Sequence, residues 1–204
     1  RPIHLVVWWW AGFLILTIAG ERLELSRVMR LPDWVKWLFV AVTAVFCGGL
    51  IVTLFNYDWG LRLNGLGMIL LSVWLLMFDL ARRNVRKPGL TGYIAACLLS
   101  GYIWLGVGGL LALGYGAVSA GPIYDAILHA IFLGFTFGMI FGHAPIIFPA
   151  VLGRPLPYRP AFYLHLILLQ ITLLLRIGGD LINSPAMRQW GGLLNALVLL
   201  IFLA

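Results

Sequence analysis

The chain has 204 residues, of which 62% are apolar and 10% are charged, and its formal net charge is +7. The apolar residues form runs of about 20, the length that a helix needs to cross a bilayer. This composition excludes a soluble globular protein. The positive charge is explained by membrane topology and does not indicate nucleic acid as a partner.

We predict an all-α, polytopic transmembrane helical bundle of about seven spans, which forms a single domain over residues 1–204. The spans are expected at residues 3–19, 34–55, 61–80, 91–113, 123–148, 161–175 and 190–204. The chain starts without methionine and ends inside an apolar run. We therefore expect it to be part of a longer protein.

Alternating spans divide the basic residues unequally between the two sides of the membrane. One side receives Arg22, Arg27, Arg30, Lys36, Arg82, Arg83, Arg86, Lys87, Arg154 and Arg159, and the other receives Arg1, Arg62, Arg176 and Arg188. The positive-inside rule places the first set in the cytoplasm and the start of the first span outside. The lipid bilayer is thus the first expected partner.

The remaining polar residues are expected to have structural roles. Glu21, Glu24 and Asp79 adjoin basic loops and predict ordinary surface ion pairs. Gln170 and Thr172 lie within the sixth span, where polar side chains commonly form hydrogen bonds between helices.

The fifth span, residues 123–148, combines small residues with ionisable ones. Gly134, Gly138 and Gly142 recur at four-residue spacing, which favours close packing of a neighbouring helix. On the roughly opposite face lie His129 and His143, fourteen residues apart. Helix geometry separates these two by roughly 40° in rotation and about 21 Å along the axis.

The predicted topology sorts the four histidines into two levels. His4 and His129 lie near the outer side, and His143 and His165 near the cytoplasmic side. Ionisable groups within spans are rare and usually functional, although a histidine can also serve only as a hydrogen-bonding group between helices. Asp125, one turn before His129, is suited either to orient that ring or to interact with the helix dipole.

Two levels of paired histidines predict one or two b-type haems, because haem b is commonly held by two histidines from different helices. His143 and His165 would ligate the inner haem iron, and His129 and His4 the outer one. The propionates would face Arg154 and Arg159 at the inner level and Arg176 at the outer level. Copper is not expected, since four histidines cannot supply its ligands alongside two haems.

The leading functional hypothesis is therefore a haem protein that transfers electrons within or across the cytoplasmic membrane, in a complex with other redox or membrane subunits. The alternative is a cofactor-free subunit that scaffolds a respiratory or photosynthetic complex. Neither a Walker loop nor an HExxH motif occurs in the sequence.

The segment HAIFLGFTFGMIFGHAPIIFPAVLGRPL, residues 129–156, resembles the C-terminal half of the NnrS family, as does LTIAGERLELSR at residues 16–27. These are haem- and copper-containing bacterial membrane proteins linked to nitric oxide. The resemblance implies a bacterial inner-membrane haem protein that acts on nitric oxide, a second alternative function. This chain departs from the family by having Leu152 before Gly153, no histidine in its fourth span, and His143 at a usually apolar position.

Overall fold

The structure, a computed structural model, describes residues 2–154 and 157–203, and in these ranges it contains helices and no strand. The helices are α1 (Ile3–Leu25), the 3-10 helix η1 (Ser26–Met29), α2 (Asp33–Val52), α3 (Tyr57–Phe78), α4 (Ala81–Asn84), α5 (Leu90–Tyr115), α6 (Pro122–His129), the π-helix η2 (Ala130–Phe137), α7 (Gly138–Leu152), α8 (Phe162–Leu181) and α9 (Pro185–Leu203).

Seven helical segments in the described ranges are long and apolar enough to cross a membrane, with α6, η2 and α7 forming one continuous span. The predicted all-α, polytopic bundle is thereby confirmed. The largest extensions beyond the predicted bounds are in α1, which continues to Leu25, in α8, which continues to Leu181, and in α9, which begins at Pro185. Interfacial turns contain polar residues that hydropathy does not register, and proline suits the first turn of a helix. The predicted end of the last span, Ala204, lies outside the described residues.

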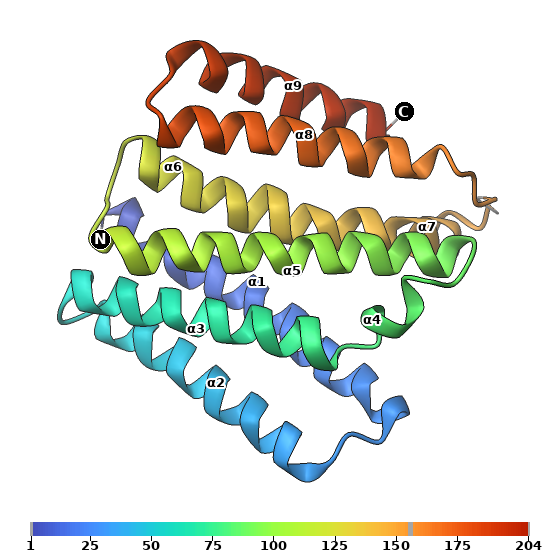
Figure 1. The fold of residues 1–204 in the computed structure, drawn as a ribbon, viewed down its shortest axis with the longest axis horizontal. Helices are drawn as coiled ribbons and strands as arrows, with labels where there is room; N and C mark the ends of the chain where they lie inside the picture. Colours follow the sequence, from blue (N-terminus) through green and yellow to red (C-terminus); the bar gives the residue numbers. More distant parts are fainter. Residues whose placement is uncertain (1, 155–156, 204) are drawn as a thin grey trace.

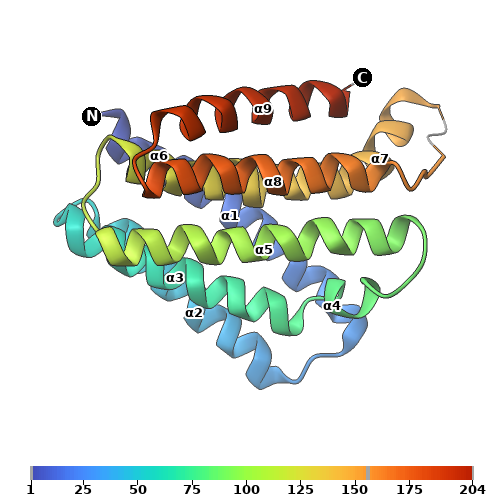
Figure 2. The same ribbon diagram turned by 45° about the horizontal axis from the view of Figure 1, so that its top comes forward.

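The helices lie side by side in the order α9, α8, α6–α7, α5, α3 and α2, and α1 crosses this row at a slant (Figures 1 and 2). In this position α1 contacts α2, α3 and η2. Helices from both halves of the sequence therefore surround the central helix α5.

Alternate connections lie at opposite ends of the bundle (Figure 1). The links α1–α2, α3–α5 and α7–α8 share one end, here called the basic end, with the exposed residues Arg27, Lys36, Arg82, Arg83, Arg86, Lys87, Arg154 and Arg159. The other end, here called the opposite end, has the remaining links and Arg62, Arg176 and Arg188. The grouping of basic residues expected from alternating spans is thus present.

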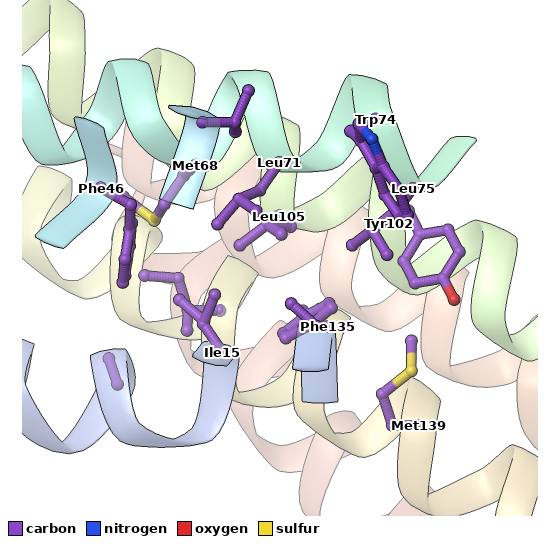
Figure 3. Packing of buried hydrophobic residues seen from close by; sticks show 14 of the residues in the cluster. Ile15, Phe46, Met68, Leu71, Trp74, Leu75, Tyr102, Leu105, Phe135 and Met139 are labelled. Carbon is purple, nitrogen blue, oxygen red and sulfur yellow. The ribbon is translucent and has the colours of Figure 1, made fainter. Parts of the chain in front are cut away.

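The core contains large apolar side chains from five helical segments. Figure 3 shows Ile15, Phe46, Met68, Leu105 and Phe135 gathered between α1, α2, α3, α5 and η2, and all five are buried. Removal of such side chains from contact with lipid does not by itself drive membrane helices together, so close packing is the main stabilising contribution.

One of the closest approaches between α2 and α3 occurs at Gly49. A Cβ atom at this position would lie 2.3 Å from the backbone nitrogen of Asn64. Only glycine therefore permits the observed helix spacing. By contrast, the adjacent Gly48 has open space where its Cβ would be.

We expect Gly49→Ala to destabilise the bundle by about 1–3 kcal/mol, because α2 must move away from α3. Gly48→Ala is the matched control and should be neutral or stabilising by up to about 1 kcal/mol, since alanine favours helix. Reversible unfolding in mixed micelles, followed by far-UV circular dichroism, measures both. Equal stability of the two variants would contradict the packing role of Gly49.

The fifth span packs its glycine stripe against α5, as predicted. A Cβ at Gly134 would lie 2.4 Å from the Trp104 side chain, and one at Gly142 would lie 3.1 Å from Cys97. The middle of this span is the π-helix η2, in which the Thr136 hydroxyl donates a hydrogen bond to the Ile131 carbonyl at 3.1 Å. Such π-helical turns are rare and often occur at functional sites.

The polar residues of α8 form the interhelical hydrogen bonds that the sequence predicts. The Trp104 indole N–H donates to Gln170 Oε1 at 2.6 Å, which links α5 to α8. The Thr172 hydroxyl donates to Asn195 Oδ1 at 2.6 Å and links α8 to α9.

Candidate functional site

His4 lies at the opposite end and packs against an aromatic residue of α3. Its ring centroid is 5.6 Å from that of Tyr57, in an edge-on arrangement. The Tyr57 hydroxyl donates to the Val118 carbonyl at 2.8 Å and accepts a hydrogen bond from the Trp8 indole at 3.0 Å. His4 is thus part of an interfacial aromatic group, and none of these contacts brings it to His129.

His129 faces a different set of neighbours, on α6 and α8. Its Nδ1 atom is 2.8 Å from the Asp125 carbonyl oxygen and 3.4 Å from Asp125 Oδ1. Both neighbours are acceptors, so Nδ1 carries a proton and donates toward Asp125. Asp125 therefore orients His129, which is one of the two roles that the sequence suggested for it.

Asp125 and His129 belong to a larger ion network at the opposite end. Arg176 of α8 pairs with Asp125, and its Nη1 atom also donates to the Arg188 carbonyl of α9 at 2.5 Å. Asp180 is 1% exposed and lies 2.8 Å from Arg188 Nε and 3.6 Å from Arg176 Nε. The network connects α6, α8 and α9.

This network contains the kinds of ligand atom that a metal site uses, but its carboxylate charges are already neutralised by arginines. One potential ligand atom from each of Asp125, His129 and Asp180 lies within 4.8 Å of the others. However, the two carboxylates already face two guanidinium groups, Arg176 and Arg188, and a divalent cation would add to this positive charge. The cluster therefore fits an ion-pair network better than a metal centre.

Asp180 was not among the candidate residues found from the sequence. The available signal was its position four residues after Arg176 in an apolar run, a spacing that places both side chains on one helix face.

His143 lies near the basic end and uses both ring nitrogens. Its Nδ1 atom is 2.7 Å from the Met139 carbonyl oxygen, and its Nε2 atom is 3.3 Å from Arg22 Nη2. Arginine can only donate, so Nε2 accepts this bond and Nδ1 donates to the carbonyl. This assigns the neutral tautomer to His143, whose Nε2 can ligate iron only if Arg22 moves away.

Arg22 belongs to a buried polar group at the same depth. Arg22 is 6% exposed, and Asp79 and Tyr102 are buried as well. Asp79 Oδ1 accepts a hydrogen bond from the Ala81 backbone N–H at 2.7 Å. Arg22 Nε, Asp79 Oδ2 and the Tyr102 hydroxyl have no hydrogen-bond partner among the residues described. In Figure 3 the Tyr102 hydroxyl points away from the apolar core.

The predicted surface role is therefore wrong for Asp79, which the turn into α4 places beneath the surface of the bundle. It is confirmed for exposed Glu24, which pairs with exposed Arg27 at 3.0 Å, whereas exposed Glu21 pairs at the same distance with the buried Arg22. Burial raises the pKa of the Asp79 carboxyl, and the hydrogen bond from Ala81 and the charge of Arg22 only partly oppose this.

The raised pKa of Asp79 predicts a pH-dependent stability. The folded state holds its proton at a pH where the unfolded state has lost it, so stability is complete below the unfolded pKa and falls as pH rises through the folded pKa. We expect Asp79→Asn to remove the part of this decline that Asp79 contributes. Melting temperatures of both proteins from pH about 4 to about 8 measure it. The exposed residue Glu24 provides the control, Glu24→Gln, and a wild-type decline retained in Asp79→Asn would contradict the assignment.

His165 lines the hollow with the best set of ligand-binding features. This hollow has a volume of about 390 Å³ and lies between α5, α7, α8 and α9. Its walls include Tyr93, Phe162 and Phe202, and Arg159 adds a positive charge. The half-buried ring of His165 packs edge-on against Phe202, with centroids 6.0 Å apart. A metal-ligating atom, an apolar aromatic wall and a cation thus share one space.

A second hollow, of about 320 Å³, lies on the α1 side of α7 and is bordered by His143. The two hollows share Ala144 and Phe148 but have different neighbouring helices. The structure therefore places His143 and His165 at the same end of the bundle but in separate hollows.

Arg154, the remaining predicted propionate partner, is exposed in the α7–α8 link. The following residues of the NnrS-like motif, Pro155 and Leu156, lie outside the described residues. Arg159 is thus the basic-end candidate that the structure places at a hollow.

The fold and these sites define a multi-pass helical membrane protein with ionisable clusters near both ends. The profile of a family described as "Domain of unknown function (DUF8744)" matches residues 1–204, so the chain belongs to that family. Neither the curated proteins nor the solved structures contain a significant match to it.

Proposed function

We propose that the protein is a membrane-embedded b-type haem protein whose haem occupies the His165 hollow. The observation that carries this proposal is the coincidence of His165, aromatic walls and Arg159 around one space of about 390 Å³. Ligand-binding clefts have volumes of about 300–1,000 Å³ and mostly apolar and aromatic walls with a few polar groups, and this hollow has both features. His165 would be the axial ligand and Arg159 the partner of a propionate.

The second axial position distinguishes two kinds of haem protein. His143 faces the other hollow, and its Nε2 accepts a hydrogen bond from Arg22. His165 would therefore be the histidine that this chain supplies to the iron, and a haem held by one histidine could also bind a small neutral molecule such as nitric oxide. This supports the NnrS-like alternative over the bis-histidine electron carrier, and the resemblance at residues 129–156 points in the same direction.

The proposed location is the bacterial inner membrane, with the basic end in the cytoplasm. The positive-inside rule supports this orientation, because exposed basic residues gather at one end. The His165 hollow would then lie near the cytoplasmic face. Exposed apolar residues of α9, such as Leu193 and Leu200, are available to lipid or to partner subunits.

The absorption spectrum of the mildly purified protein, with haem quantified as its pyridine haemochrome, tests the proposal. We expect one b-type haem per chain, a high-spin spectrum and, in the reduced protein, a shift on addition of carbon monoxide. A low-spin spectrum unaffected by carbon monoxide would support bis-histidine ligation instead. Protein that contains no haem and binds none when it is added would overturn the proposal and favour the cofactor-free scaffold.

A further inference from the structure

Two adjoining hollows lie on the α2–α3 side of the bundle, away from the His165 hollow. The first has a volume of about 570 Å³ and is bordered by Arg82, Arg83 and Arg86. The second has a volume of about 230 Å³ and lies between α2 and α3, with Trp34 among its lining residues. Met77 and Phe78 border both hollows, so the two adjoin each other at the end of α3.

The chemistry changes sharply from one hollow to the other. The first lies where α3 ends and α4 begins, at the basic end, whereas the lining of the second is almost entirely apolar. The second hollow extends as far as Leu70, eight residues before Phe78, which corresponds to about 12 Å along the helix. A charged space at the membrane surface is thus followed by an apolar groove that runs into the bilayer.

Within the described ranges, the charges of the three arginines of the first hollow are not neutralised by nearby carboxylates. All three are exposed, and among the described residues none of them forms an ion pair within 4.0 Å. Arg82 donates a hydrogen bond to the Met77 carbonyl at 3.3 Å, which holds its guanidinium beside the entrance of the groove. Asp79 also borders this hollow but is buried. Burial raises the pKa of the Asp79 carboxyl, which limits its neutralisation of the arginines.

We infer that these hollows form a binding site for one anionic phospholipid. The phosphate lies among Arg82, Arg83 and Arg86, and an acyl chain lies in the groove between α2 and α3. Arginine guanidinium groups suit phosphate oxygens through charge-assisted hydrogen bonds. A soluble phosphate would use only the basic hollow, so the apolar groove beside it selects for a lipid.

Native mass spectrometry of the detergent-purified protein, with added phosphatidylglycerol or phosphatidylcholine, tests this site. We expect the protein to retain phosphatidylglycerol. Its affinity for this lipid should fall roughly a hundredfold in the triple variant Arg82→Gln, Arg83→Gln, Arg86→Gln. The matched control replaces three basic residues of a different hollow at the same end, Arg27→Gln, Arg30→Gln and Lys36→Gln. This control should retain the lipid.

A second variant examines the groove separately from the charges. Val73→Trp places a large side chain in the groove from a half-exposed position. It should therefore weaken binding of the whole lipid but leave binding of glycerol phosphate unchanged. Unchanged lipid retention in the arginine triple variant would overturn the inference. So would an equal loss in the control triple variant, or equal affinity of the protein for glycerol phosphate and for the whole lipid.

Discussion

Replacing His165 with alanine is expected to remove most of the haem from the purified protein, whereas replacing His143 with alanine should leave the haem content unchanged. The reason is geometric, because His165 borders the hollow with Arg159, and His143 borders a different one with its Nε2 engaged by Arg22. Haem per chain, measured as the pyridine haemochrome, gives the result directly. Size-exclusion chromatography establishes that each variant remains folded.

A further variant separates ligation from a merely structural role of His165. In His165→Gly, added imidazole can occupy the vacated ligand position, so haem binding should recover together with a b-type spectrum. His129→Ala is a control at the opposite end and should retain its haem. If His143→Ala lost the haem and His165→Ala kept it, the axial ligand would be His143 and the proposed hollow would be wrong.

The helices could be predicted from the sequence because their signals are local. Runs of about 20 apolar residues determine where spans can lie. The asymmetric basic residues likewise indicate which connections share an end. The glycine stripe at Gly134, Gly138 and Gly142 predicts a close helix contact, and the structure supplies its partner, α5.

The sites could be predicted only in part, since they depend on the order and rotation of the helices. The structure puts His143 and His165 at the same end of the bundle, but sequence spacing does not show that α1 lies beside His143 and contributes Arg22. Asp79 was assigned to the surface because it adjoins a run of basic residues. Its burial depends on the turn into α4 and on Tyr102 of α5, both of which are tertiary features.

The π-helix η2 is a similar case. Its residues, Ala130–Phe137, are mostly apolar and have no local feature that distinguishes them from an ordinary α-helical turn. Gly134 lies within this segment and packs against the Trp104 side chain of α5. Such a contact can be found only when the neighbouring helix is known.

Arg176→Ala is expected to destabilise the protein by about 3 kcal/mol, because in this partly buried ion network it leaves Asp125 without its guanidinium partner and Asp180 with Arg188 alone. Arg176 forms an ion pair with Asp125, and its Nε atom lies 3.6 Å from a carboxylate oxygen of Asp180, whose side chain is completely buried. Its backbone also packs against Gly191, where a Cβ would lie 2.7 Å from Arg176 Cα. The network is therefore a main polar link between α8 and α9, and unfolding in mixed micelles measures its contribution.

The exposed pair Glu24–Arg27 provides the control for this effect. Arg27→Ala should cost less than about 1 kcal/mol, since both side chains are well solvated. The double variant Arg176→Ala, Asp125→Asn should recover part of the lost stability, because it removes one of the uncompensated charges. If Arg176→Ala were no more destabilising than Arg27→Ala, the cluster would be a solvated ion pair and α9 would be held by apolar packing alone.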